Sequence, residues 1–382
     1  MNILLIHQYF KTPEEGGGIR SWHIAKSWVE RGHKVTVLTA SNTRSGLYRI
    51  KGIEVEYFPI RYENSFGFIK RVRAFIRFLF ACKSYLRYHH GFELAYVLTT
   101  PLTTAFIALH VKNTYGIPYV FEVGDLWPRV PIELGIIKNP LIKKYLQNLE
   151  KNAYQASEKL VALSPAIKEH IQHRVPDKEI AIIPNMSDCD FFNTGISYTG
   201  QDPLKICYFG AISYANHLEF LLEAAETSQK QEIPLEFHLM GFGGLKKKIQ
   251  SLSSHLKNIH WHEEGGMNHV RELLHNCHAT YISYLDHPVL NTGSPNKLFD
   301  GLASGHLIIL NFDGWIRELI EEHKCGFSYD PLAPEEFVEK ISKYIQSPEM
   351  IANHQKRSRK LAENQFEVNT LTHQLNKFLD LN

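Results

Sequence analysis

The sequence predicts an α/β protein with two parallel-sheet domains that face each other across a cleft. Short apolar runs alternate with amphipathic stretches along the chain, a pattern typical of strands joined by helices and therefore of parallel sheets. The length of 382 residues is sufficient for two hydrophobic cores. The pattern is interrupted at residues 187–203, which gather Gly, Ser, Thr, Asn and Pro as a linker does.

Residues 1–186 are expected to form the first domain. The strands predicted there are NILLIHQYF, RGHKVTVLTAS, GIEVEYFPI, FELAYVLTT, IPYVFEVGDLWP, KLVALS and EIAIIPN. Helices are expected between most of them. The first of these helices follows KTPEEGGGIR and places Ile19, Trp22, Ala25 and Trp28 on one side.

Residues 204–360 repeat the pattern and are expected to form the second domain. The strands predicted there are LKICYFGAI, LEFHLMGFGG, NIHWHEEG, ATYISYL, LIILN and the short GFSYD. Two long helices of mixed charge finish the chain, and the last of them occupies residues 361–382. Ligands of such sheets bind beyond the carboxyl ends of the strands, so we expect the site residues there.

The overall composition is that of an ordinary soluble protein. A formal charge of +2 gives no reason to expect a nucleic-acid partner, and 44% of the residues are hydrophobic. The five cysteines lack metal-ligand spacing, and their odd number fits reduced thiols in a cytoplasm. The first residues lack the basic segment of a signal peptide, and no apolar run has the length of a spanning helix. We therefore expect a cytoplasmic protein.

The glycine-rich stretch EEGGGIR follows the first predicted strand and precedes a helix. Gly16, Gly17 and Gly18 permit close approach of the backbone to a ligand, and Arg20 stands at the helix start. The stretch is a candidate loop for the acceptor or a phosphate. Its spacing differs from the dinucleotide fingerprint, so a nicotinamide or flavin cofactor is not expected. The alternative is a surface turn.

Two acids lie where another strand of the first domain is expected to end. Glu122 and Asp125 in FEVGDLWP are candidates for a catalytic base or for a ligand of a substrate hydroxyl. The alternative is that both carboxylates only cap a helix or a turn.

The stretch GSPNKLFDGLASG, residues 293–305, predicts a short helix with one polar side. Ser294 is the expected N-cap, Pro295 occupies the first turn, and Asn296, Lys297 and Asp300 share the polar side. Free N–H groups and a lysine at a helix start attract an anion, while Asp300 can accept hydrogen bonds from a ribose. The alternative is a capped surface helix.

Glycines at two further strand ends are predicted to approach the same ligand. They are Gly210 in YFGAISYANH and Gly241 in LMGFGG. A metal site is not expected. Asp188 and Asp190 form an acid pair, but they lie in the predicted linker, and His260 and His262 lack further ligands at suitable spacing.

Residues 66–90 are unusual because they hold six Lys or Arg, several aromatic residues and no acid. A polar face of one charge sign beside large aromatic side chains is typical of a helix lying on an anionic membrane surface. Phe75, Phe78 and Phe80 would add apolar insertion if they pointed outward. Helical phase does not allow all three to face the lipid, because Phe75 and Phe78 are three residues apart and Phe80 lies well round the wheel from both. The alternative is a core helix with a basic rim.

Several of these stretches occur together in a known family. They are RGHKVTVLTA after the glycine-rich loop, FEVGDLWP, IPN before the linker, and SPNKLFDGLASGHLIILN followed by RELIEEHKCGFSYDP. With them the chain resembles the retaining glycosyltransferases of family four over nearly its whole length. It is most similar to the bacterial transferases of O-antigen, capsule and exopolysaccharide assembly, many of which use amino-sugar nucleotides.

The resemblance implies a GT-B fold in which the last helix packs back on the first domain. It also implies metal-independent and cofactor-free transfer of a sugar, such as an N-acetylated amino sugar, from a nucleotide diphosphate donor. The acceptor would be lipid-linked or an oligosaccharide, and the enzyme would be peripheral on the inner face of the cytoplasmic membrane.

Residue by residue, the resemblance places the donor ribose on Asp300 and the diphosphate on residues 294–297. Asp125 matches a position on the acceptor side. The chain departs from the family at Thr292, where the first of two paired acids is usual. The basic residues that often hold the diphosphate are absent from YFGAISYANH. These departures support the alternative of a non-catalytic partner that binds a nucleotide sugar or lipid. A nucleotide-sugar epimerase on the same fold is a second alternative.

Overall fold

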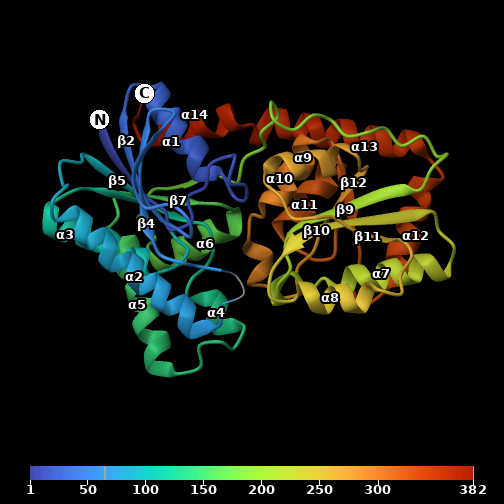
Figure 1. Ribbon diagram of the computed structural model, residues 1–382, viewed down its shortest axis with the longest axis horizontal. Helices are drawn as coiled ribbons and strands as arrows, with labels where there is room; N and C mark the ends of the chain where they lie inside the picture. Colours follow the sequence, from blue (N-terminus) through green and yellow to red (C-terminus); the bar gives the residue numbers. More distant parts are fainter. Residues whose placement is uncertain (64–65, 382) are drawn as a thin grey trace.

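The computed structural model describes residues 1–63 and 66–381. Residues 64–65, within the expected first domain, and residue 382, the last of the expected C-terminal segment, lie outside the described residues. Figure 1 shows two α/β domains side by side, with both chain ends on the first domain. The two parallel-sheet domains of the predicted fold are therefore confirmed.

The first domain contains an eight-stranded sheet in the order β3-β4-β2-β1-β5-β6-β7-β8. Its strands are β1 Asn2–Ile6, β2 Lys34–Ser41, β3 Gly46–Ile50, β4 Ile53–Pro59, β5 Leu94–Leu98, β6 Tyr119–Val123, β7 Lys159–Ala162 and β8 Ile180–Ile182. Its helices are α1 Arg20–Glu30, α2 Phe68–Leu86, α3 Thr104–Tyr115, α4 Arg129–Glu133, α5 Pro140–Ala156 and α6 Pro165–Arg174. All pairings are parallel except β3 with β4, and β3 was not predicted from the sequence.

The second domain contains a six-stranded parallel sheet in the order β11-β10-β9-β12-β13-β14. Its strands are β9 Leu204–Ala211, β10 Leu235–Phe242, β11 Ile259–Trp261, β12 Ala279–Ile282, β13 Leu307–Leu310 and β14 Gly326–Ser328. Its helices are α7 Glu219–Lys230, α8 Lys246–Ser253, α9 Met267–His275, α10 Asn296–Ala303, α11 Trp315–Glu322, α12 Pro334–Ile345 and α13 Pro348–Leu361. Strands β12 and β13 are buried along their whole length, because helices cover both faces of a parallel sheet.

The end of the chain returns to the first domain. After α13, a π-helical turn at Ala362–Phe366 leads into α14, Val368–Phe378. The Ser187 N–H donates to the carbonyl of Phe366 at 2.7 Å, so the outgoing and returning segments pair where they cross between the domains. Helix α14 then packs on α1, and the Trp28 indole N–H donates to Asn376 Oδ1 at 2.7 Å (Figure 1). The predicted crossing of the last helix is therefore confirmed.

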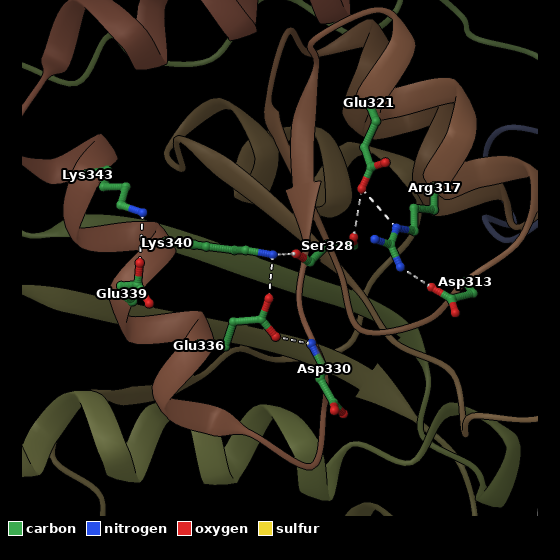
Figure 2. A network of polar contacts seen from close by, with 9 residues as sticks. All are labelled: Asp313, Arg317, Glu321, Ser328, Asp330, Glu336, Glu339, Lys340 and Lys343. Carbon is green, nitrogen blue, oxygen red and sulfur yellow. Dashed lines mark hydrogen bonds and ion pairs between the residues drawn. The ribbon is translucent and has the colours of Figure 1, made fainter.

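The outer part of the second domain carries a network of exposed ion pairs, which Figure 2 shows around α11 and α12. Arg317 contacts Asp313 at 2.5 Å and Glu321 at 2.9 Å, and Lys340 contacts Glu336 at 2.6 Å. Solvent screens such pairs, so each adds little to stability.

Helix α2 is partly a core helix, with two of its three phenylalanine rings buried and the third exposed. Phe78 is buried in the core beside the sheet with Ala74, Cys82 and Leu86, and Phe75 is buried in a stack with the Tyr62 ring. Phe80, which lies elsewhere on the helical wheel, is 63% exposed. None of the described helices is both long and apolar enough to cross a membrane.

Candidate functional site

Helix α10 begins in the cleft, and the first domain holds the segment that leads into it. The Asn185 N–H donates to Ser294 Oγ at 3.3 Å, and Asn185 Nδ2 donates to the Ser294 carbonyl at 2.5 Å. The helix starts at Asn296 with Pro295 as N-cap, so the expectation that Ser294 caps it is wrong. The Ser294 hydroxyl is engaged by the other domain, and it positions α10 against that domain.

Two further contacts fix the same segment across the domains. Ser164 Oγ donates to the Thr292 carbonyl at 2.6 Å, and Ser187 Oγ donates to the Phe299 carbonyl at 2.8 Å. The Thr292 hydroxyl donates to the Val289 carbonyl at 2.8 Å and therefore serves a local turn. Hydrogen bonds from Ser164, Asn185 and Ser187 thus tie the segment around the start of α10 to the first domain.

Lys297, in the first turn of α10, is a buried cation without a partner. The side chain is 9% exposed, and Nζ makes no hydrogen bond within the part of the chain that the structure describes. The amine lies 4.0 Å from the centre of the Tyr208 ring. Burial lowers the pKa of Lys297 to about 7. A buried amine without an acceptor is unfavourable unless a ligand supplies one, and a phosphate would do so.

The glycines at the ends of β9 and β10 have different roles. A Cβ at Gly210 would lie 3.9 Å from Lys297 Cε, so the end of β9 lies beside this lysine. A Cβ at Gly241 would lie 2.5 Å from the Gly210 carbonyl oxygen. Gly241 is therefore required by the close packing of the two strands, and a ligand contact is not needed to explain it.

The glycine-rich loop reaches the second domain. A Cβ at Gly16 would lie 2.9 Å from Gly266 Cα, just before α9, and a Cβ at Gly18 would lie 3.0 Å from Asn296 Nδ2. Around Gly17, no atom of the described residues other than its two chain neighbours lies within 4 Å of such a Cβ. The loop therefore closes over the start of α10, where the sequence placed a phosphate or acceptor loop.

Arg20 and Glu122 form a buried ion pair, which corrects their expected roles in phosphate binding and catalysis. Arg20 Nε donates to Glu122 Oε1 at 2.9 Å and its NH2 group to Oε2 at 3.0 Å, while its NH1 group binds the Pro184 carbonyl. The Tyr96 hydroxyl also donates to Glu122. With exposures of 7% and 1%, both side chains are engaged inside the first domain. They fix the start of α1 to β6 and are not free to react with a substrate.

Asp125 lies in the cleft, just beyond the end of β6. The residue is exposed, and Thr100 Oγ1 donates to its Oδ2 at 3.3 Å. Surrounding protein atoms raise its pKa by reducing solvation, and the Thr100 hydrogen bond partly offsets this. The charge of Asp125 also raises the pKa of Tyr284, after the larger effect of burial, so the two residues lie within electrostatic reach across the cleft. The Asp125 carboxylate can therefore accept a hydrogen bond from a hydroxyl group.

A small pocket lies between the glycine-rich loop and the starts of α9 and α10. Its lining includes Gly17, His23, Asp188, Met267, Asn296 and Asp300. Burial and the charge of Asp188 raise the pKa of Asp300 well above its usual value. The sequence singled out Asn296 and Asp300, but it gave no signal for His23 and assigned Asp188 to a linker. Among the described residues, no group of three or more His, Cys, Asp or Glu side chains is arranged to hold a metal ion.

The cleft therefore combines a buried cation, two carboxylates in a pocket and an exposed carboxylate on the opposite side. The cation at Lys297 suits phosphate oxygens, and the carboxylates at Asp188 and Asp300 suit hydroxyl donors. Together with Asp125 they have the chemistry to bind a nucleotide diphosphate and to orient a hydroxyl nucleophile.

Comparisons with known proteins agree with this arrangement. Residues 15–186 match the glycosyl transferase 4-like domain, and residues 196–364 match the glycosyl transferases group 1 family. No curated protein sequence matches the chain significantly.

Solved structures share the fold over its full length. Sucrose-phosphate synthase from Thermosynechococcus elongatus has 13% identity and a TM-score of 0.80, with 99% of this chain and 98% of that chain covered. HepE from Anabaena in complex with UDP-glucose has 16% identity and a TM-score of 0.72, with 100% and 99% covered. WaaG, a glycosyltransferase involved in lipopolysaccharide biosynthesis, has 15% identity and a TM-score of 0.70, with 98% and 99% covered. The chain is a two-domain GT-B glycosyltransferase of the family-four-like type, with a glycosyl transferase 4-like domain followed by a group 1 domain.

Proposed function

We propose that this protein is a retaining glycosyltransferase of bacterial surface-polysaccharide synthesis. It moves a sugar, such as an N-acetylated amino sugar, from a nucleotide diphosphate donor to a lipid-linked or oligosaccharide acceptor. No metal ion or cofactor takes part. The new bond joins the acceptor oxygen to the anomeric carbon as the bond to the diphosphate breaks, and the acceptor proton passes to the leaving phosphate on the same face.

The observation that carries the proposal is the unpartnered ammonium group of Lys297 at the start of α10. The group lies beside the backbone of Gly210 and near a loop of the opposite domain. A diphosphate bound there would satisfy the lysine, and the free N–H groups of the first helical turn would add to its binding. The structure of HepE in complex with UDP-glucose supports a nucleotide sugar as the ligand.

The direct experiment is transfer of radiolabel from a panel of nucleotide sugars into membrane lipid by the purified protein. We expect incorporation from one donor of the panel. Asp125→Asn should reduce turnover far more than nucleotide affinity, because its proposed role is to orient the acceptor hydroxyl. Thr103→Ser, a change of similar size near the same strand ends, is the matched control.

Nucleotide binding without transfer to lipid, oligosaccharide or water would contradict the proposed activity. That outcome would favour the alternative of a non-catalytic partner, which the Thr292 side chain supports because it supplies no acid to the donor sugar. Conversion of a free nucleotide sugar to its epimer would show that the protein is instead a nucleotide-sugar epimerase.

The lipid-linked acceptor and the anionic membrane surface are supported by the exposed side of α2. Ile69 and Phe80 are 82% and 63% exposed, and Lys70, Arg73 and Arg77 are exposed among them. Helix α3 contacts both α2 and α5, and the first turns of α5 add a second exposed apolar group, Leu141, Ile142 and Tyr145, with Lys144. Each basic side chain near an anionic surface contributes about 1 kcal/mol. On this proposal the enzyme is peripheral on the cytoplasmic face of the membrane.

Sedimentation with liposomes tests this part of the proposal. The wild type should bind anionic but not neutral vesicles at low salt, and charge reversal of Lys70, Arg73 and Arg77 to Glu should release it. The control is the same charge reversal to Glu at Lys230, Lys247 and Lys257, which are exposed on the second domain. This control variant should still bind anionic vesicles. If the wild type does not bind anionic vesicles at low salt, α2 does not bind a membrane.

A further inference from the structure

The pocket between the domains contains two side chains that the proposed donor site does not explain. His23 lies on α1, and Asp188 lies where the chain leaves the first domain. Both line the same pocket as Asp300, although the three come from separate segments of the chain.

The Asp188 carboxylate is fixed by one of its oxygens and leaves the other available. Oδ1 accepts the Phe191 N–H at 2.9 Å, which holds the side chain in a turn. Oδ2 lies 3.8 Å from His23 Nε2, which is too far for a hydrogen bond. The His23 ring makes no hydrogen bond to any other residue that the structure describes.

The charge state of the pocket defines the ligand it would take. Burial lowers the pKa of His23 to about 4, so the ring is neutral near pH 7 and has one donor and one acceptor. The two carboxylates are acceptors, and they are close enough for the charge of Asp188 to raise the pKa of Asp300. Arg20 also lines the pocket, but its guanidinium group is paired with Glu122, so the acceptors that remain suit a group with two neighbouring hydroxyl donors.

Lys297 supplies an independent indication of how a ligand would lie. Its amine is buried and unpartnered one residue after Asn296, which lines the pocket. A nucleoside diphosphate would therefore place its phosphates at the lysine and its sugar at the acids. The two neighbouring hydroxyls of ribose match the two carboxylates.

We propose that Asp188 and His23 complete a clamp for the ribose diol of the donor nucleotide. Asp300 accepts from one hydroxyl, and the second hydroxyl fits between Asp188 Oδ2 and His23 Nε2. The inference rests on the proposed donor site and extends it to specificity, because a 2′- or 3′-deoxynucleotide would leave one of these acceptors unpaired.

The test is calorimetric titration of the full-length protein with UDP, 2′-deoxy-UDP and 3′-deoxy-UDP. Asp188→Asn is the informative variant, because the asparagine carbonyl can still accept the Phe191 N–H and preserve the turn. Its UDP affinity should fall about tenfold, as a charge-assisted hydrogen bond is lost. One of the two deoxynucleotides lacks the hydroxyl that would bind Asp188, and Asp188→Asn should hardly change the affinity for that deoxynucleotide. Asp190→Asn, at an exposed acid two residues further on, is the control.

The possible results separate this inference from the donor site itself. If Asp300→Asn weakens UDP binding while Asp188→Asn does not, the clamp is wrong and the donor site stands. An equal loss for UDP and both deoxynucleotides in Asp188→Asn also overturns the clamp, because the acid then acts through general charge or structure. If the wild type binds no nucleoside diphosphate, the donor site fails and the clamp fails with it.

Discussion

Arg20 and Lys297 are both buried cations at the start of a helix that borders the cleft, but their surroundings differ. Arg20, from the first domain, has a bidentate contact with Glu122 and a third contact with the Pro184 carbonyl. Lys297, from the second domain, has only the face of the Tyr208 ring. A fold tolerates a buried charge that is fully paired and is destabilised when one partner is removed, whereas a buried charge without a partner is unfavourable until a ligand pairs with it. The comparison indicates a structural role for Arg20, and it is the reason for proposing Lys297 as the binding residue.

The largest effect is expected on the free energy of unfolding when Arg20 is replaced. Arg20→Met leaves the Glu122 carboxylate buried without its cation and should reduce the free energy of unfolding by about 3–5 kcal/mol. Urea denaturation measures this loss. Replacing both partners, Arg20→Met with Glu122→Met, should recover much of it, because no buried charge then remains unpaired. A loss below about 1 kcal/mol in the single variant would contradict the structural role.

Lys297→Met is expected to reduce ligand affinity without reducing stability, in contrast to Arg20→Met. Affinity for UDP should fall about ten- to a hundredfold, since a charge-assisted hydrogen bond contributes about 1.5–3 kcal/mol. The free energy of unfolding should stay the same or rise, because a desolvated ammonium group is removed while the side-chain length is kept. Calorimetry and urea denaturation on the same sample check the two parts. Strong destabilisation with unchanged affinity would reverse the assignment.

The pH dependence of stability sharpens the comparison. The pKa of Lys297 is lowered from 10.5 to about 7, so between these values the unfolded chain binds more protons than the folded one. The free energy of unfolding of the wild type, relative to Lys297→Met, should therefore rise with pH in this window, by at most about 1.4 kcal/mol per pH unit. Urea denaturation at several pH values measures the difference. A difference that does not vary with pH would mean that Lys297 keeps an ordinary pKa.

The smallest effect is expected for the exposed ion pairs of Figure 2. Arg317→Met removes contacts with Asp313 and Glu321, yet it should reduce the free energy of unfolding by less than about 1 kcal/mol. The loss should shrink further at high salt, because screening weakens exposed pairs. A loss as large as that of Arg20→Met would show that burial is not what separates the two kinds of cation.

The sequence predicted those features that depend on local pattern. The position of α10 follows from Pro295, the helical spacing and Gly305, and the parallel sheets follow from alternating strands and helices. Strand β3 was missed, because an exposed edge strand shows neither a buried run nor a regular alternation. On α2, helical spacing correctly separated Phe80 from Phe75 and Phe78, but it could not tell which side faces the sheet.

Contacts between distant residues could not be predicted in this way. Arg20 and Glu122 are 102 residues apart, and only the placement of α1 against β6 brings them together. Ser294 has the properties of an N-cap, but Asn185 of the other domain engages its hydroxyl. His23 and Asp188 meet in one pocket for the same reason. Local pattern located the donor side of the cleft, and tertiary packing decided which polar groups remained free.

The central claim is that the ammonium group of Lys297 receives the diphosphate, and proton uptake on binding tests it most directly. At about pH 8, one unit above its pKa, the lysine is mostly neutral in the free protein, and a bound diphosphate should restore its proton. Calorimetric titration with UDP in two buffers of different ionisation enthalpy should therefore show uptake of up to about one proton by the wild type and none by Lys297→Met. Equal affinity and equal proton uptake in the two proteins would contradict the claim.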